Sequence, residues 1–153
     1  MGILQNVFTR FSQTVKAYTG DEPLMHAAVS AASNVIVADG EVAGEEFETA
    51  LLGMRSNPIL EKGYDTLMLE QELYEGIARA RTRAGRVENL RRVAAIAHRP
   101  EEQRQNVFLI AADVADHEGI SAIEDKALSE IAAALSVDKA MLLQTARALP
   151  SRA

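Results

Sequence analysis

Residues 34–54, NVIVADGEVAGEEFETALLGM, and residues 107–131, VFLIAADVADHEGISAIEDKALSEI, follow the same plan. Each stretch begins as an apolar helix, followed by a turn that contains acidic residues and a glycine. Each then continues as a second helix with inward aliphatic side chains. Ser121 and Glu124 have the spacing of a capping box, which opens the later helix of the second stretch. The sequence therefore predicts two similar helix-turn-helix units, at about residues 23–56 and about residues 100–136.

The rest of the chain is also predicted to be helical, because apolar residues recur at spacings of three and four and no run alternates as a strand would. Gly85 is expected to separate two helices. The expected helices cover about 3–18, 21–40, 44–57, 65–84, 87–98, 100–116, 121–136 and the residues after 138. No linker is long enough to divide the chain, so we expect an all-α fold: a single domain over residues 1–153, built as a compact bundle of about seven to eight helices.

Composition narrows the class of protein. The chain is 48% hydrophobic and 25% charged, with a mean hydropathy of −0.06, which is typical of a globular domain. It has no cysteine, so any metal must be held by oxygen or by imidazole. No apolar run approaches the roughly twenty residues of a transmembrane helix, and the start MGILQNVFTRF lacks the pattern of a secretory signal. We expect a cytoplasmic protein.

Charge and motif content argue against two further classes. A net charge of −6 and an isoelectric point near 5.1 disfavour binding to nucleic acid. The sequence has no phosphate loop, no Gly-x-Ser-x-Gly elbow and no Cys-His pair, so we expect no catalytic activity.

One segment, residues 79–99, is markedly basic, and Glu88 is its only acidic residue. It lacks aromatic residues for base stacking, and its arginines are scattered around the helix, which favours a solvated face. Docking of an anionic partner remains the alternative. The seven arginines are Arg79, Arg81, Arg83, Arg86, Arg91, Arg92 and Arg99.

The two acidic turns are the principal candidate site, because hard cations such as calcium and magnesium need several oxygen ligands. They do not form an EF-hand, since Ala43 stands four residues after Asp39, where that loop needs a ligand. Capping of helix N-termini is the competing explanation for acids at helix starts, but it does not explain Asp39 and Asp116, which lie at helix C-terminal ends. The candidate metal ligands are Asp39, Glu41, Glu45, Glu46, Asp116, Glu118 and Glu124.

The two turns also carry a family resemblance. The stretches ADGEVAGEE (38–46) and ADHEGISAIEDKALSEIAAALSV (115–137) resemble the TerB tellurite-resistance family of bacteria. The intervening GYDTLMLEQELYEGI (63–77) is similar to the middle helix of that family, and MGILQNVFTRF (1–11) to its opening, so the resemblance spans nearly the whole chain.

The resemblance implies an internally duplicated helical domain and a non-catalytic divalent-metal-binding and interaction module. The acidic positions of the family would be occupied by Asp39 with Glu46 and by Asp116 with Glu124. The cation would be calcium, magnesium or zinc. The partners would be other proteins of a tellurite-resistance or stress-response complex at the inner membrane surface.

The second turn departs from the family pattern in two ways. His117 replaces the glycine expected after the aspartate, and the spacing from Asp116 to Glu124 is one residue longer than the spacing from Asp39 to Glu46. The choice between Asp116 and Glu118 as the principal acid of this turn therefore stays open, and His117 is interpreted as an exposed turn residue rather than a nitrogen ligand. The alternative function is a structural adaptor without metal, which would dock an anionic partner through residues 79–99.

Overall fold

The computed structural model describes residues 20–40, 44–116 and 119–148, and within these ranges every element is a helix and no strand occurs. The predicted all-α fold is confirmed. The helix expected at about 3–18 lies outside the described residues. The helices are α2 (Glu22–Val37), α3 (Gly44–Arg55), α4 (Pro58–Gly63), α5 (Thr66–Ala80), α6 (Arg83–Ala94), α7 (Glu101–Ala115), α8 (Ala122–Leu135) and α9 (Lys139–Ala148).

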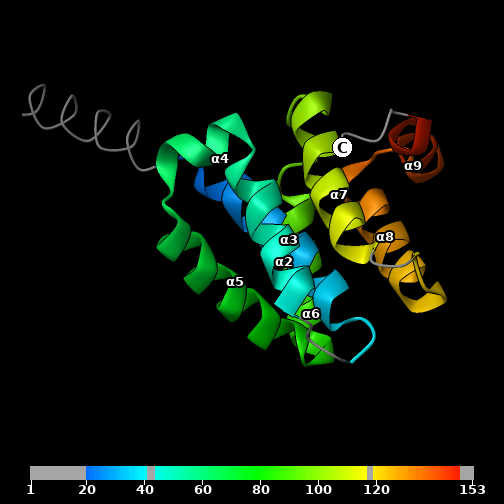
Figure 1. The fold of residues 1–153 in the computed structure, drawn as a ribbon, viewed down its shortest axis with the longest axis horizontal. Helices are drawn as coiled ribbons and strands as arrows, with labels where there is room; N and C mark the ends of the chain where they lie inside the picture. The colour runs from blue at the N-terminus through cyan, green and yellow to red at the C-terminus, as the bar shows by residue number, and fades with distance from the viewer. Residues whose placement is uncertain (1–19, 41–43, 117–118, 149–153) are drawn as a thin grey trace, which may run out of the picture.

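Helix α2 is the centre of the bundle (Figure 1). It packs against α5, α6 and α7, and it also contacts α3 and α8, while α9 lies at the outside against α7 and α8. Twelve of its residues are buried, as expected for a helix with neighbours on every side. The two predicted units, α2 with α3 and α7 with α8, are thereby placed next to each other.

Local sequence signals explain where most helices begin. The Asp21 side chain accepts a hydrogen bond from the Leu24 amide at 3.2 Å, and Asp65 accepts one from the Met68 amide at 2.8 Å. The predicted capping box is confirmed, because the Ser121 hydroxyl and the Glu124 carboxylate each accept the other residue's backbone amide. These caps satisfy amides that have no partner inside the helix.

One predicted boundary is wrong and one helix was not predicted. Helix α3 ends before Asn57-Pro58, as predicted, but the sequence did not predict the short helix α4, which Asn57 caps by accepting hydrogen bonds from the amides of Ile59 and Leu60. Gly85 was expected to separate two helices, but the break falls at Thr82, whose hydroxyl accepts the Gly85 amide at 3.0 Å. Gly85 therefore lies inside α6, where only glycine fits, because a side-chain carbon would collide with the backbone carbonyl of Arg79.

A hydrogen-bonded chain of buried side chains joins α2, α5 and α6. Asn89 is fully buried and donates to Asn34 Oδ1 at 2.9 Å and to the Gly76 carbonyl at 3.2 Å. Asn34 Nδ2 in turn donates to the Arg86 carbonyl at 3.2 Å, and Arg79 Nε donates to Asn89 Oδ1 at 3.0 Å. Since unpaired buried polar groups are costly, this chain fixes the position of α6 on α2.

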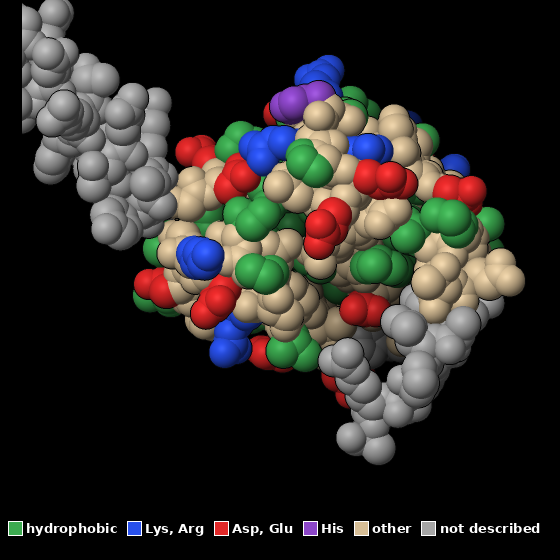
Figure 2. Space-filling view, turned by 90° about the horizontal axis from the view of Figure 1, so that it is seen from above, with side chains coloured by type: hydrophobic (Ala, Val, Ile, Leu, Met, Phe, Trp, Pro, Cys, Tyr) green, Lys and Arg blue, Asp and Glu red, His purple; other side chains and the backbone are tan. Residues whose placement is uncertain are grey.

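The surface is mixed in character. On the face shown in Figure 2, acidic, basic and apolar side chains are interspersed. None of the described helices is long and apolar enough to cross a bilayer.

Candidate metal centre

Three acidic side chains from two different units lie together at one end of the bundle. Asp39 follows the last turn of α2, Glu46 belongs to the first turn of α3, and Glu124 to the first turn of α8. One carboxylate oxygen from each residue lies within 4.8 Å of the other two. We call Asp39, Glu46 and Glu124 the acidic cluster.

The turn between α2 and α3 places the first two members. Gly40 has a φ of +83°, a left-handed backbone conformation that side chains disfavour, and it follows Asp39 directly. Helix α3 begins at Gly44 and packs against α2. Glu46 then points into the interior beside Phe47, and only 8% of its surface is exposed.

Glu46 is the electrostatically unusual member of the acidic cluster. Its Oε2 atom is buried and has no hydrogen-bond partner among the described residues. Burial, together with the nearby charges of Asp39 and Glu124, raises the pKa of Glu46 from 4.5 to about 7. The ionised form of Glu46 is therefore unfavourable, because neither a hydrogen bond to Oε2 nor a nearby positive charge stabilises it among the described residues.

Glu124 has two roles available to it. Its Oε1 atom accepts the Ser121 amide at 3.1 Å, which confirms the capping explanation for this residue. Only 8% of the Glu124 surface is exposed. The side chain also supplies an oxygen to the acidic cluster. Because a carboxylate has two oxygens and several lone pairs, capping and cation binding are compatible at Glu124.

The donor set fits a hard divalent cation. Three carboxylate oxygens without nitrogen or sulfur suit calcium, magnesium or manganese better than zinc. The three carboxylates lie close enough together for one ion to contact an oxygen of each. Water or backbone carbonyls would complete the coordination shell. A bound cation would also neutralise the charge that raises the pKa of Glu46.

The structure separates the other predicted ligands from this group. Asp116 lies at the C-terminal end of α7, is exposed, and is not a member of the acidic cluster. Glu45 is exposed at the start of α3 and is also not a member. Glu41, His117 and Glu118 lie outside the described residues, so the choice between Asp116 and Glu118 is not resolved by geometry.

Asp113 forms a second, smaller acidic feature with Asp116. Desolvation raises the pKa of Asp113 from its ordinary value, and the Asp116 charge raises it further. This pair belongs to α7, whereas the acidic cluster joins both units.

Sequence reasoning missed a pocket between α2, α6 and α8. It flagged Arg83 and Arg86 as part of a basic segment, but it did not identify Asn34 or Lys126, which line the same pocket. Asn34 is the detectable signal, because it is a polar residue within an apolar stretch of α2. Lys126 carries no comparable signal, since lysine is ordinary on a helix surface.

Comparison with known proteins adds no assignment: no family model, no curated protein and no solved structure matches this chain.

Proposed function

We propose that this chain is a non-catalytic module that binds a divalent cation at the acidic cluster and mediates protein interactions in a bacterial tellurite-resistance or stress-response system. The cation-binding part rests on one observation: the buried carboxyl group of Glu46, whose Oε2 atom has no hydrogen-bond partner among the described residues, lies beside the carboxylates of Asp39 and Glu124. The physiological part, including a cytoplasmic position at the inner membrane, rests on the resemblance of the two acidic turns to the TerB family.

The proposed cation has a structural consequence. It would join the turn between α2 and α3 to the first turn of α8, and so connect the two helix-turn-helix units. A ligand that binds only the folded state raises its stability by mass action. We therefore expect calcium or manganese to raise the melting temperature of chelator-treated protein.

Calorimetric titration tests the proposal. Calcium, magnesium, manganese and zinc would each be added to chelator-treated wild type and to the variants Asp39→Asn and Glu46→Gln. We expect at least one hard cation to bind more tightly than about 1 mM and each variant to weaken it about tenfold or more, because each removes a charged ligand. Wild type that binds no cation more tightly than this, or unchanged binding in Glu46→Gln, would contradict the proposal.

Two matched controls share the charge change but lie outside the acidic cluster. Glu48→Gln alters an exposed residue of the same helix as Glu46, and Asp116→Asn alters the second turn. Both should bind the cation as wild type does. If Asp116→Asn weakens binding as much as Asp39→Asn does, the ligand set includes the second turn, and the assignment to the acidic cluster alone is wrong.

The alternative, a metal-free adaptor that docks an anionic partner through residues 79–99, has less support. Most of these arginines already have partners within the chain: Arg79 donates to Asn89, Arg86 to the Ala80 carbonyl, and Arg99 to Asp21, while Arg91 and Arg92 pair with Glu88. The two functions separate in one experiment, because only the metal-binding module should melt at a lower temperature in the presence of a chelator.

A further inference from the structure

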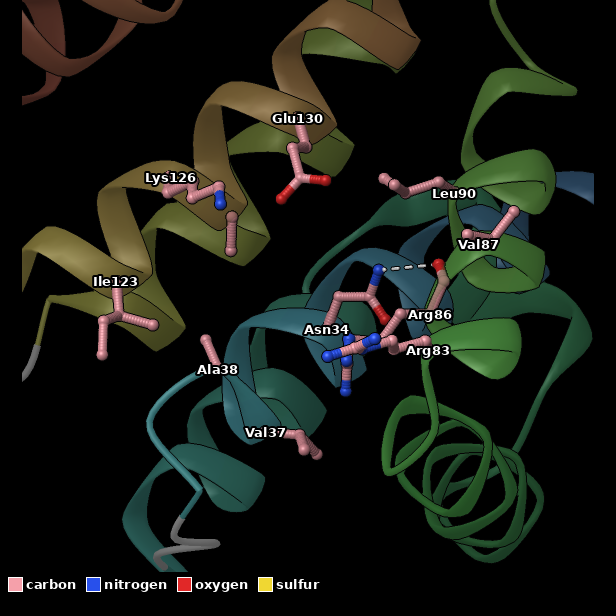
Figure 3. Close-up of a pocket in the computed structure, with 11 residues that line it drawn as sticks. Asn34, Val37, Ala38, Arg83, Arg86, Val87, Leu90, Ile123, Lys126 and Glu130 are labelled. Carbon is pink, nitrogen blue, oxygen red and sulfur yellow. Dashed lines mark hydrogen bonds between the residues drawn. The ribbon is translucent and has the colours of Figure 1, made fainter.

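A pocket lies between α6 and α8, floored by the C-terminal end of α2, and its volume is about 450 Å³. This volume falls within the range of small-molecule sites. Figure 3 shows side chains from all three helices around it, with Lys126 on α8 facing Arg83 and Arg86 on α6. We call this space the α6–α8 pocket.

The charged groups that line the α6–α8 pocket are mostly cationic. Arg83, Arg86 and Lys126 face it, against a single carboxylate from Glu130. Arg83 and Lys126 are exposed, and no hydrogen bond or ion pair is found for either among the described residues. Three cationic groups against one carboxylate leave an excess of positive charge in the pocket, so an anion bound between them would be stabilised.

The start of α6 increases this positive potential. Arg83 is the first residue of the helix and Arg86 the fourth, and the first turn contains no acidic residue. The N-terminal end of a helix carries a partial positive charge, where anions are favoured and cations are disfavoured. Two arginines at this end are therefore unfavourable for the isolated helix and favourable for holding an anion.

Apolar side chains form the rest of the wall. Val87 is 50% exposed and Ile123 is 57% exposed, although both are large β-branched residues. Leu90 and Val37 extend the same surface deeper into the pocket. An apolar surface next to a few converging polar groups is the usual character of a small-molecule site.

The pocket is held in shape before any ligand binds. At its floor, Asn34 donates to the Arg86 carbonyl, drawn as the dashed line in Figure 3, and accepts from Asn89. Arg86 Nη1 also donates to the Ala80 carbonyl at 3.0 Å, which limits the freedom of its guanidinium. Because these contacts already exist, less ordering is needed when a ligand binds.

We propose that the α6–α8 pocket binds a small organic oxyanion, a carboxylate or phosphate monoester with an apolar body. Arg83, Arg86 and Lys126 hold the anionic group, and the body packs on Val87 and Ile123. A small molecule fits better than an extended acidic polymer, because Glu130 closes one end with negative charge and the whole chain carries a net charge of −6. This proposal does not depend on cation binding at the acidic cluster.

A pair of dyes tests the charge requirement. 8-Anilinonaphthalene-1-sulfonate has an apolar body and an anionic group, and N-phenyl-1-naphthylamine has the same body without the charge. Fluorescence titration in chelator, which removes any contribution from the acidic cluster, should show saturable binding of the sulfonate about tenfold or more tighter than that of the uncharged dye. Equal binding of the two dyes, or no saturable binding of the sulfonate, would overturn the proposal.

Variants of the pocket cations locate the site. Arg83→Gln with Lys126→Gln should weaken binding of the sulfonate about tenfold or more without a fall in melting temperature, because both residues are exposed and Arg83 lies where a helix disfavours positive charge. Arg91→Gln is the matched control on α6, since Arg91 is 75% exposed, pairs with Glu88 and does not line the pocket. Equal weakening by Arg91→Gln, or none by the pocket variants, would mean that the dye binds elsewhere.

Competition identifies the source of the anion. Monomeric octanoate and octyl phosphate should displace the sulfonate, and a nitrogen–proton correlation spectrum should show shifts at residues 34–38, 83–90 and 123–130. If these monomers fail and only vesicles of phosphatidylcholine with phosphatidylglycerol displace the dye, the surface binds a membrane, and the proposal of a single-molecule site is wrong.

Discussion

A carboxylate oxygen of Glu46 on α3 lies within 4.8 Å of a carboxylate oxygen of Glu124 on α8, although the two residues belong to different helix-turn-helix units. Each is only 8% exposed, so the like charges meet where water can screen them little. The bundle tolerates this arrangement by holding Glu46 with a pKa of about 7. A cation or a proton at Glu46 would therefore reduce the repulsion between the carboxylates of the acidic cluster.

The raised pKa of Glu46 should make the stability of the protein depend on pH. Its pKa rises from 4.5 to about 7 on folding, so between these values the folded protein binds more protons than the unfolded chain. The free energy of unfolding should therefore fall as pH rises through this window and level off above about pH 7, with a total effect on the order of 3 kcal/mol. Urea denaturation in chelator, repeated across this range, measures it.

Glu46→Gln isolates this effect from other titrating groups. The variant should be more stable than wild type at pH 8 and similar to it near pH 4.5, because glutamine replaces the protonated carboxyl group without a charge. Glu48→Gln, on the exposed side of the same helix, should show no such difference. Parallel stability curves for wild type and Glu46→Gln would show that Glu46 titrates normally.

Cation affinity should rise with pH, whereas the stability of the cation-free protein should fall as pH rises. Below about pH 7 a cation must displace the proton from Glu46, so its apparent affinity should fall by up to about tenfold per pH unit. Calorimetry with calcium between pH 8 and pH 5.5, in two buffers of different ionisation enthalpy, measures both the affinity and the proton released. Binding without proton release at pH 6 would mean that Glu46 is not a ligand.

Close packing between α2 and α5 makes Gly76 a sensitive position. A side-chain carbon there would lie 2.9 Å from Val29 Cγ1 and would overlap the Ser33 hydroxyl. Gly76→Ala should therefore destabilise the protein by about 1–3 kcal/mol, even though alanine favours a helix by about 1 kcal/mol. Gly44→Ala, at a helix position with open space, is the matched control and should be neutral or slightly stabilising.

Ser33→Ala completes a double-mutant cycle with Gly76→Ala. The Ser33 hydroxyl is buried and has no hydrogen-bond partner, so Ser33→Ala alone should be neutral or stabilising. The double variant should recover part of the stability lost by Gly76→Ala, as measured by urea denaturation. Strict additivity of the two changes would show that the clash with Ser33 is not the cause.

Most helix positions could be predicted because their signals are local. Capping residues such as Asp21, Asp65 and Ser121 stand next to the helices that they begin, and the hydrophobic period continues from there. Gly85 was misread because glycine usually ends a helix, whereas here it admits the carbonyl of Arg79 from the preceding helix. This reason depends on tertiary packing, which a local sequence pattern does not show.

The candidate site could be predicted only in part for the same reason. The acidic composition of both turns was visible in the sequence, but it could not show that Glu124 reaches Glu46 while Asp116 stays outside the acidic cluster. Nor could it show that Lys126 faces Arg83 across a pocket. Both facts depend on how the second unit packs on the first.

The pairing of Asp21 with Arg99 should contribute more to stability than an ordinary helix cap does. Asp21 caps α2, and its two oxygens accept from Arg99 Nη1 at 2.7 Å and Nη2 at 2.9 Å. Asp65 caps α5 and forms no ion pair within the part of the chain that the structure describes, so Asp65→Ala is the matched control and should cost about 1 kcal/mol. Asp21→Ala should cost about 2–4 kcal/mol, because it also leaves the partly buried guanidinium without its carboxylate.

Acid titration gives an independent measure of the same ion pair. The hydrogen bonds from Arg99 hold the pKa of Asp21 below its ordinary value of 3.8. The stability that the pair contributes should therefore be fully present above that value and lost as pH falls through the lower pKa of the folded state, which is the opposite sign to Glu46. Asp21→Asn keeps an oxygen for the cap and removes the charge, so it should lose this acid-sensitive component while retaining most of the capping contribution. Equal costs for Asp21→Ala and Asp65→Ala at neutral pH, or an unchanged acid limb in Asp21→Asn, would show that the pair contributes little and that α2 is held in place by its core contacts.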